Sequence, residues 1–132
     1  MVDASVAVSW CLRDEFAPIT RELLMRVDRE GGLAPTIWQY EVVNALILAE
    51  RRNRISGDEV STCIDFLSSL PIAFDAGYWS THVPGVAQIA QRFRLTIYDA
   101  SYLELAARSE MPLATLDRRL LEAAERLGVP LA

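Results

Sequence analysis

Residues 95–124 read LTIYDASYLELAARSEMPLATLDRRLLEAA and decide the fold. The stretch alternates a short apolar run, Asp99, an amphipathic helical pattern, a second short apolar run, Asp117 and a second helical pattern. Each aspartate therefore stands where a strand is expected to end and a helix to begin. In a parallel α/β sheet this position is the carboxyl edge, outside which ligands bind. Aspartate is also a favoured helix N-cap, so neither residue requires a further role.

The rest of the chain repeats the alternation of short apolar runs with helical patterns. It predicts an α/β fold in three layers, α/β/α, whose mainly parallel sheet has helices on both faces. Thr36 is a suitable N-cap for the third helix, and Pro84-Gly85 is expected to kink or split the helix around it. We expect short strands near 1–3, 33–35, 71–74 and 129–131 and in the apolar runs before Asp99 and Asp117. We expect helices over 4–12, 19–29, 37–52, 56–69, 79–93 and 118–127, and one more directly after Asp99.

Two further carboxylates occupy matching positions. Asp3 follows a very short strand and precedes a helical pattern, as Asp99 and Asp117 do. Glu41 lies on a helix that is apolar almost all round, on one stripe with Asn44. A carboxylate in such a setting is costly unless it is paired or binds a metal. Pairing with an arginine or a backbone group and a functional role both remain open for Glu41.

The composition excludes several classes of chemistry. The chain has 132 residues, 52% of them hydrophobic, which suits one globular domain over 1–132. All 13 basic residues are arginine, and His82 is the only histidine, so P-loop, Schiff-base and histidine-rich metal sites are excluded. Cys11 and Cys63 form no metal-binding spacing and are expected to be small buried residues. Carboxylate oxygens remain, and they select hard cations such as Mg²⁺ or Mn²⁺.

The charge pattern bears on partners and location. A net charge of −5 argues against a broad basic surface for nucleic acid, although a local arginine patch is compatible with it. Arg51, Arg52 and Arg54 form such a group at the end of a helix. They are either solvated residues favoured by the helix dipole or contacts for phosphates. No apolar run is long enough to span a membrane and no leader opens the sequence, so we expect a soluble cytoplasmic protein.

Four carboxylates at one site repel each other and cannot all ionise cheaply without cations. Divalent metal removes this penalty. Two ions about 3.5–4 Å apart can hold the attacking and leaving oxygens of a phosphodiester displacement. A metal-activated water can then be the nucleophile, so this chemistry needs no histidine base.

Four segments carry a family resemblance: VDASVAVSW at 2–10, YEVVNAL at 40–46, YDASYLELA at 98–106 and ATLDRRL at 114–120. Together they resemble PIN-domain ribonucleases, particularly the VapC-type toxins of VapBC toxin–antitoxin pairs. The resemblance implies a Mg²⁺- or Mn²⁺-dependent endoribonuclease with about five parallel strands, usually a homodimer. It also implies the following site residues: an acidic quartet of Asp3, Glu41, Asp99 and Asp117, with supporting polar residues Ser5, Asn44 and Thr115.

Two other functions are compatible with parts of this pattern. A phosphoacceptor receiver domain also gathers aspartates around Mg²⁺, but it needs a lysine and adjacent acids that this chain lacks. A PIN-like scaffold that binds protein without catalysis would use the acids only as caps.

For a toxin, the resemblance implies a VapB-like antitoxin. We expect its tail to place an arginine near Asp99 and Asp117, because arginine pairs bidentately with carboxylates. The tail would lie along an apolar groove on the helices, unless the groove residues are ordinary core; these residues are Trp10, Leu12, Trp38 and Val42.

Overall fold

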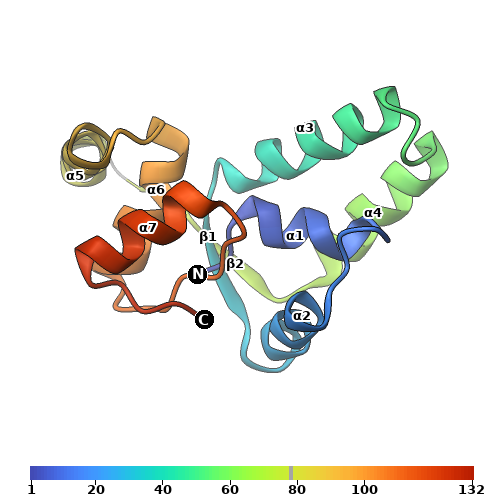
Figure 1. Cartoon of the computed structure of the whole chain (residues 1–132), viewed down its shortest axis with the longest axis horizontal. Coiled ribbons are helices and arrows are strands. Elements are labelled where there is room, and N and C mark those ends of the chain that lie inside the picture. Colours follow the sequence, from blue (N-terminus) through green and yellow to red (C-terminus); the bar gives the residue numbers. More distant parts are fainter. Residues whose placement is uncertain (78) are drawn as a thin grey trace.

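The computed structural model describes residues 1–77 and 79–132. Its two strands, β1 (Gly32–Pro35) and β2 (Ile72–Asp75), pair in parallel, with Gly32 opposite Ile72 and Pro35 opposite Asp75. Figure 1 shows the strands in the middle, with α5, α6 and α7 on one side and α1 to α4 on the other. The helices are α1 (Ala4–Cys11), α2 (Pro18–Glu30), α3 (Trp38–Arg51), α4 (Gly57–Ser69), α5 (Trp79–Phe93), α6 (Ile97–Arg108) and α7 (Arg118–Leu127). The predicted α/β fold with a parallel sheet is confirmed.

Three further extended segments continue the parallel pairing beside β1. The Val2 amide donates to the Leu33 carbonyl at 3.0 Å, and the Asp3 amide donates to the Ala114 carbonyl at 2.9 Å. Val2 and Ala114 form one parallel bridge, and Leu113 and Leu131 form another. Each segment pairs over only one or two residues, and in the first case α1 begins almost at once, at Ala4. The predicted sheet of about five strands is therefore not confirmed by the described part of the chain, which has two strands and these bridges.

Helix boundaries follow local capping residues in several places. Asp3 is the N-cap of α1 and Asp117 is the N-cap of α7. Ser56 and Glu59 form a capping box at the start of α4, where each side chain accepts from the other residue's amide. Gly128 ends α7 in the left-handed conformation, with φ of +82°, which glycine adopts without strain.

The predicted strand before Asp99 is wrong. Helix α6 begins at Ile97, with Thr96 as its N-cap. The Asp99 amide donates to Thr96 Oγ1 at 3.0 Å, and that hydroxyl donates to Asp99 Oδ2 at 2.7 Å. This reciprocal cap allows the helix to begin inside the apolar run. Asp99 therefore lies in the first turn of a helix and not at the end of a strand.

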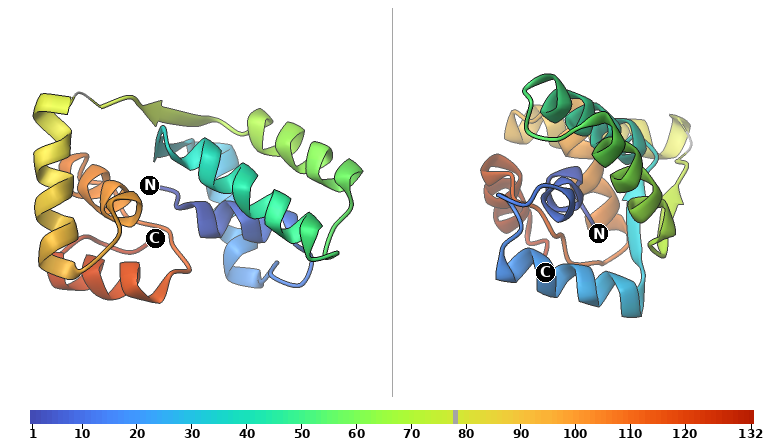
Figure 2. Two further views of the ribbon diagram at one scale, coloured as in Figure 1. Left: turned by 90° about the horizontal axis from the view of Figure 1, so that it is seen from above. Right: turned by 90° about the vertical axis from the view of Figure 1, so that its right-hand side faces the viewer.

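Two smaller predictions are also wrong. Ile37, not Thr36, is the N-cap of α3, because the Thr36 hydroxyl instead donates to the Asp75 carbonyl at the end of β2 at 2.9 Å. The split of α5 at Pro84-Gly85 is also wrong, because α5 is one helix over its 15 residues; the kink there stays a prediction. A proline inside a helix removes one backbone hydrogen bond. Contact with α6, along which α5 packs (Figure 2), offsets this loss. The packing is close, since a Cβ at Gly85 would lie 3.4 Å from Glu104 Cγ.

The predicted apolar groove along α1 and α3 is wrong as well. Helix α1 packs against α3, and Trp10, Leu12, Trp38 and Val42 are each at least nine-tenths buried. The Trp10 indole N–H donates to the Thr20 carbonyl at 2.8 Å, which ties α1 to α2. These four residues are core. Trp38 and Val42 do line a separate hollow between α3, α4 and β2.

Two observations bear on the remaining sequence-based expectations. Cys11 and Cys63 are half-buried free thiols. Across the described residues, no helix combines the length and apolar character that crossing a bilayer requires.

Helix α3 offers a matched test of where the core lies. Leu46 is fully buried, whereas Leu48, two residues on, is 37% exposed. We expect Leu46→Ala to lower the free energy of unfolding by about 2–5 kcal/mol, through lost burial and the cavity left behind. Leu48→Ala should cost less than about 1 kcal/mol. Urea unfolding followed by circular dichroism measures both, and equal losses would contradict the packing described.

Candidate active site

Asp3 is the most constrained of the predicted acidic residues. It is only 6% exposed, at the point where the first extended segment meets α1. Its Oδ2 accepts hydrogen bonds from the Ser5 hydroxyl at 2.5 Å and from the Thr115 hydroxyl at 2.7 Å. Burial raises the pKa of Asp3, and these hydrogen bonds oppose the rise. Ser5 and Thr115, predicted as supporting polar residues, thus both contact the carboxylate of Asp3.

The same two hydroxyls fix the loop that leads to Asp117. Ser5 Oγ accepts from the Leu116 amide at 2.9 Å, and Thr115 Oγ1 accepts from the Asp117 amide at 3.0 Å. Asp117 Oδ1 in turn accepts from the amides of Arg119 and Leu120 at 2.7 and 3.0 Å, capping α7. Asp3 and Asp117 are therefore held in one hydrogen-bonded unit although they are far apart in the sequence.

Glu41 enters the site from α3. Its Oε2 accepts from the hydroxyl of Tyr102 on α6 at 2.5 Å. Burial raises the pKa of Glu41, the Tyr102 hydrogen bond opposes this, and the nearby charges of Asp3 and Asp99 raise the pKa further. Burial and the Glu41 carboxylate likewise raise the pKa of Tyr102. The charges of Asp3 and Asp99 therefore both act on Glu41.

Tyr102 was not predicted as a site residue. It is fully buried, and its hydroxyl meets the carboxylate that the sequence left without a partner. In the sequence, Tyr102 fits the apolar pattern of α6 and shows no sign of a partner. Its spacing of three residues from Asp99 places both on one face of that helix, which is the signal that could have found it.

The remaining predicted residues lie outside this group. Asn44 is exposed on α3, one turn beyond Glu41. Arg51 and Arg52 are exposed at the far end of α3, and Arg51 lies about 15 Å along the helix from Glu41. Arg54 forms ion pairs with Asp14 at 2.7 Å and Glu15 at 2.6 Å. The structure does not bring these arginines to the acidic residues, and their predicted contact with RNA phosphates stays a prediction.

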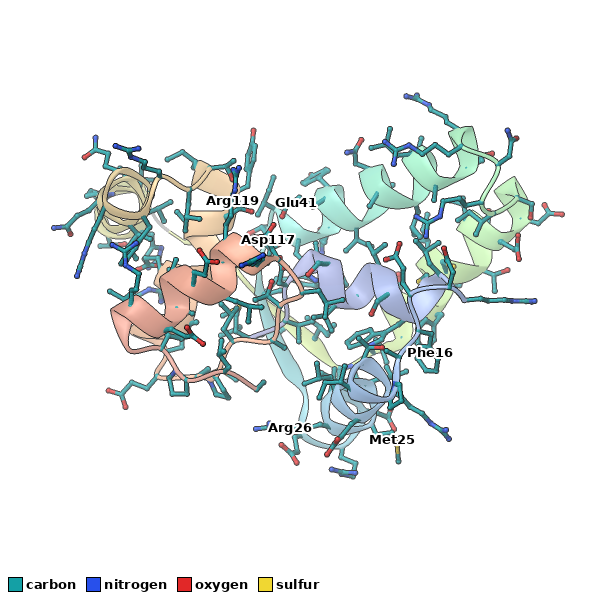
Figure 3. The ribbon with its side chains drawn as sticks, viewed as in Figure 1. Phe16, Met25, Arg26, Glu41, Asp117 and Arg119 are labelled. Carbon is teal, nitrogen blue, oxygen red and sulfur yellow. The ribbon has the colours of Figure 1, made fainter. Side chains whose placement is uncertain are left out.

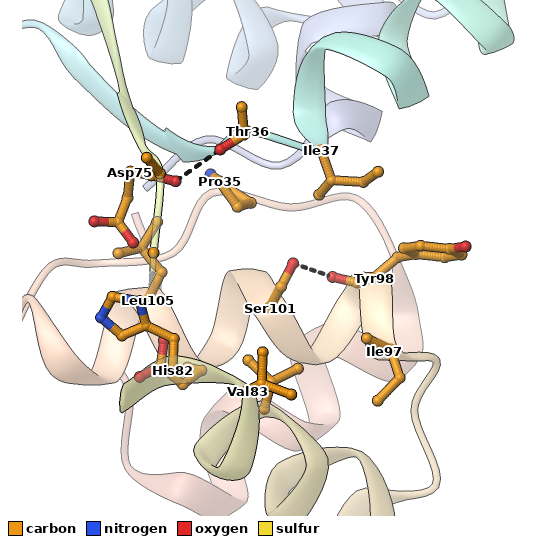
Figure 4. Close-up of a pocket in the computed structure, with 14 residues that line it drawn as sticks. Pro35, Thr36, Ile37, Asp75, His82, Val83, Ile97, Tyr98, Ser101 and Leu105 are labelled. Atoms are coloured by element: carbon orange, nitrogen blue, oxygen red, sulfur yellow. Dashed lines mark hydrogen bonds between the residues drawn. The ribbon is translucent and has the colours of Figure 1, made fainter. Parts of the chain in front are cut away.

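A hollow of about 380 Å³ adjoins the acidic residues, between α5, α6 and the ends of both strands (Figure 4). Ile97 and Tyr98, the two residues before Asp99, form part of its wall and are more than half exposed. None of the four carboxylates lines it. The hollow is an apolar neighbour of the acidic site and not part of it.

The donor set suits a hard divalent cation. The four residues offer only carboxylate oxygens, and a cation would relieve both the burial of Asp3 and the repulsion at Glu41. In the part of the chain that the structure describes, no three acidic, histidine or cysteine side chains form a group that could hold a metal ion.

The fold and the site together define a class of protein. It is an α/β protein with carboxylates gathered at one end of a parallel sheet, Glu41 and Asp117 lying between the two groups of helices (Figure 3). The sequence profile of the PIN domain matches residues 1–126. The chain belongs to the PIN-domain family.

Two relatives refine this assignment. The chain is 32% identical over 91 residues to ribonuclease VapC3 of Pyrobaculum aerophilum. These 91 residues cover 69% of this chain and 70% of that relative. The crystal structure of PAE2754 from Pyrobaculum aerophilum matches with a TM-score of 0.69 and 28% identity, covering 92% of this chain and 76% of that one. The predicted resemblance to VapC-type PIN domains is confirmed.

The repulsion at Glu41 predicts an effect on stability. We expect Glu41→Gln to raise the Tm of the metal-free protein at pH 7, because glutamine still accepts from Tyr102 but carries no charge. Solvent screens this half-exposed group, so the gain should be under about 1 kcal/mol, or roughly 2–4 °C.

The pH dependence of this gain has a definite sign. Because the pKa of Glu41 is raised in the folded protein, the folded state takes up a proton more readily than the unfolded state, and wild type gains stability as pH falls. The difference in Tm between Glu41→Gln and wild type should therefore shrink in acid. Differential scanning calorimetry in EDTA measures it. Glu50→Gln, at an exposed position of the same helix, is the control. A lower Tm for Glu41→Gln would show that its charge is stabilising.

Proposed function

We propose that this protein is a divalent-metal-dependent endoribonuclease and the toxin of a toxin–antitoxin pair. One observation carries the proposal: the hydroxyls of Ser5 and Thr115 join buried Asp3 to the loop bearing Asp117. The effect of the Asp3 and Asp99 charges on the pKa of Glu41 supports the inclusion of Glu41 and Asp99 in the acidic group. The similarity to a protein named as a ribonuclease supports RNA as the substrate.

The acidic quartet would hold the cofactor, Mg²⁺ or Mn²⁺. When bound, the ion supplies Lewis-acid activation of water and neutralises charge on the phosphodiester. The chain's own part is positioning. Ser5 and Thr115 orient Asp3, and Tyr102 orients Glu41. Thr96 orients Asp99 in the first turn of α6. Such supporting hydrogen bonds fix the direction in which each carboxylate presents its oxygens.

The same proposal covers partners and location. A nuclease with an accessible acidic site requires an inhibitor in its own cell, and we propose a VapB-like antitoxin that places an arginine near Asp99 and Asp117. We further propose a homodimer acting in the cytoplasm. The exposed apolar residues beside the site, Tyr98, Ile97 and Leu116, are available to a protein partner.

Replacement of single carboxylates tests the nuclease function. Asp3→Asn, Asp99→Asn and Asp117→Asn should each lower the rate of metal-dependent RNA cleavage by at least about 100-fold, because each removes an electrostatic contact to the reacting centre. The fold should persist, because asparagine also accepts hydrogen bonds and caps helices. Gel analysis of a labelled RNA gives the rates. Asp65→Asn, an exposed change on α4, is the control. Near-full activity of all three site variants would overturn the mechanism.

Metal binding has a readout that does not depend on activity. At about ten times Kd, Mn²⁺ should add about 1.4 kcal/mol to the stability of the wild type, or roughly 2–5 °C in Tm. Asp99→Asn should reduce this shift, whereas Asp65→Asn should keep it. Thermal scans across millimolar Mn²⁺ measure the effect. A PIN-like scaffold that only binds protein would show neither the shift nor the cleavage.

A further inference from the structure

Four arginines surround Phe93 where the end of α5 meets α7. The guanidinium carbon of Arg92 lies 4.9 Å from the centre of the Phe93 ring, and that of Arg126 lies 5.2 Å from it. Arg94 and Arg119 line a hollow of about 400 Å³ together with the same ring and Arg126. Figure 2 shows the end of α5 beside α7. We call Arg92, Arg94, Arg119 and Arg126 the Phe93 arginine cluster.

Carboxylates do not neutralise this cluster. Glu122 is the acidic residue in the wall of the hollow, and it forms an ion pair with Arg118 at 3.2 Å. Among the described residues, the arginine ion pairs engage Arg26, Arg29, Arg54, Arg108 and Arg118, and none engages a member of the cluster. Positive charge is therefore concentrated here, although the whole chain carries −5.

The cluster is ordered by its contacts. Phe93 is half-buried and packs against the core, so its ring is a fixed platform. Two guanidinium groups at about 5 Å from one ring are attracted by its π face. Like charges gathered around one ring favour an anion nearby, because the ring attracts each guanidinium but does not neutralise it.

The cluster begins beside the acidic site. The Arg119 amide donates to Asp117 Oδ1 at 2.7 Å, and Figure 3 shows Arg119 next to Asp117. Arg126 is seven residues further along α7, about 10 Å by the helical rise. A chain of anionic groups that leaves Asp117 along α7 would therefore meet successive arginines.

We propose that the Phe93 arginine cluster binds the phosphodiester backbone of the RNA strand as it leaves the acidic site. The inference rests on the proposed ribonuclease function and names where its substrate is held. Arginine's planar fork matches phosphate oxygens bidentately. Because two guanidinium groups already cover the Phe93 ring, the contact is to phosphates and not to a stacked base. Arg51 and Arg52, at the far end of α3, are then not the main phosphate contacts.

Salt dependence of RNA binding tests this assignment. The probe is a fluorescein-labelled single-stranded RNA, titrated in EDTA to prevent cleavage and followed by anisotropy at several salt concentrations. The plot of log K against log salt concentration has a negative slope, and each lost phosphate contact reduces its magnitude by about 0.7 for a single strand. The double variant Arg119→Gln/Arg126→Gln should therefore lose about 1.4 from the slope and bind about tenfold more weakly or worse at low salt. Lysine at both positions should restore most of the slope.

The matched control is Arg51→Gln/Arg52→Gln, which removes the same charge from exposed positions at the far end of α3. It should leave the slope unchanged. A cluster variant that binds like wild type, or equal losses in both double variants, would overturn the inference.

Cleavage assays separate this inference from the proposed function. A dinucleotide substrate is too short to span both the acidic site and Arg126, so Arg126→Gln should raise the KM for longer RNA by a larger factor than the KM for the dinucleotide. Cluster-dependent binding by a wild type that never cleaves RNA would support the inference and overturn the nuclease function. If the cluster variant cleaves long RNA like wild type, the nuclease function is supported and the inference about the cluster is overturned.

Discussion

The hydrogen bonds that Asp3 receives from Ser5 and Thr115 organise both the fold and the site. They join residues 112 positions apart in the sequence, at the place where two parallel segments end and α1 and α7 begin. A buried carboxylate without such donors would be expensive, and the pKa of Asp3 is raised even with them. Parallel pairing of the first segment with residues 113–115 therefore depends on satisfying this one group.

Each of the other carboxylates is satisfied in the same way, by a hydroxyl or by helix amides. Tyr102 serves Glu41, Thr96 serves Asp99, and the first turn of α7 serves Asp117. Hydroxyls compensate burial without neutralising charge, so the repulsion between Glu41 and its neighbours persists. A cation would relieve this repulsion, and the proposal of a metal site rests on it.

The sequence predicted what local chemistry determines. The caps at Asp3, Ser56 and Asp117 follow from residue type and spacing, and so do the parallel sheet and its helices on both sides. The prediction failed where two local signals compete. The apolar run before Asp99 resembles a strand, but Thr96 can cap a helix there, and the cap prevails. The site partner Tyr102 and the burial of Trp10 and Trp38 depend on helix packing, which no single segment encodes.

Helix α7 shows how stability and function can use the same residues. Its acid stands at the N-terminus and Arg126 stands in its last turn, the arrangement that the helix dipole favours in any helix. Here the N-cap Asp117 is also joined to Asp3 through Thr115, and Arg126 also lies over Phe93. Rules for helix ends place both residues but cannot say what lies opposite them. That information comes from tertiary contacts: β-type pairing brings the loop of Asp117 to Asp3, and α5 brings Phe93 to the other end. Helix α7 thus connects the acidic residues at its N-cap with the Phe93 arginine cluster, whose members Arg119 and Arg126 lie along its length.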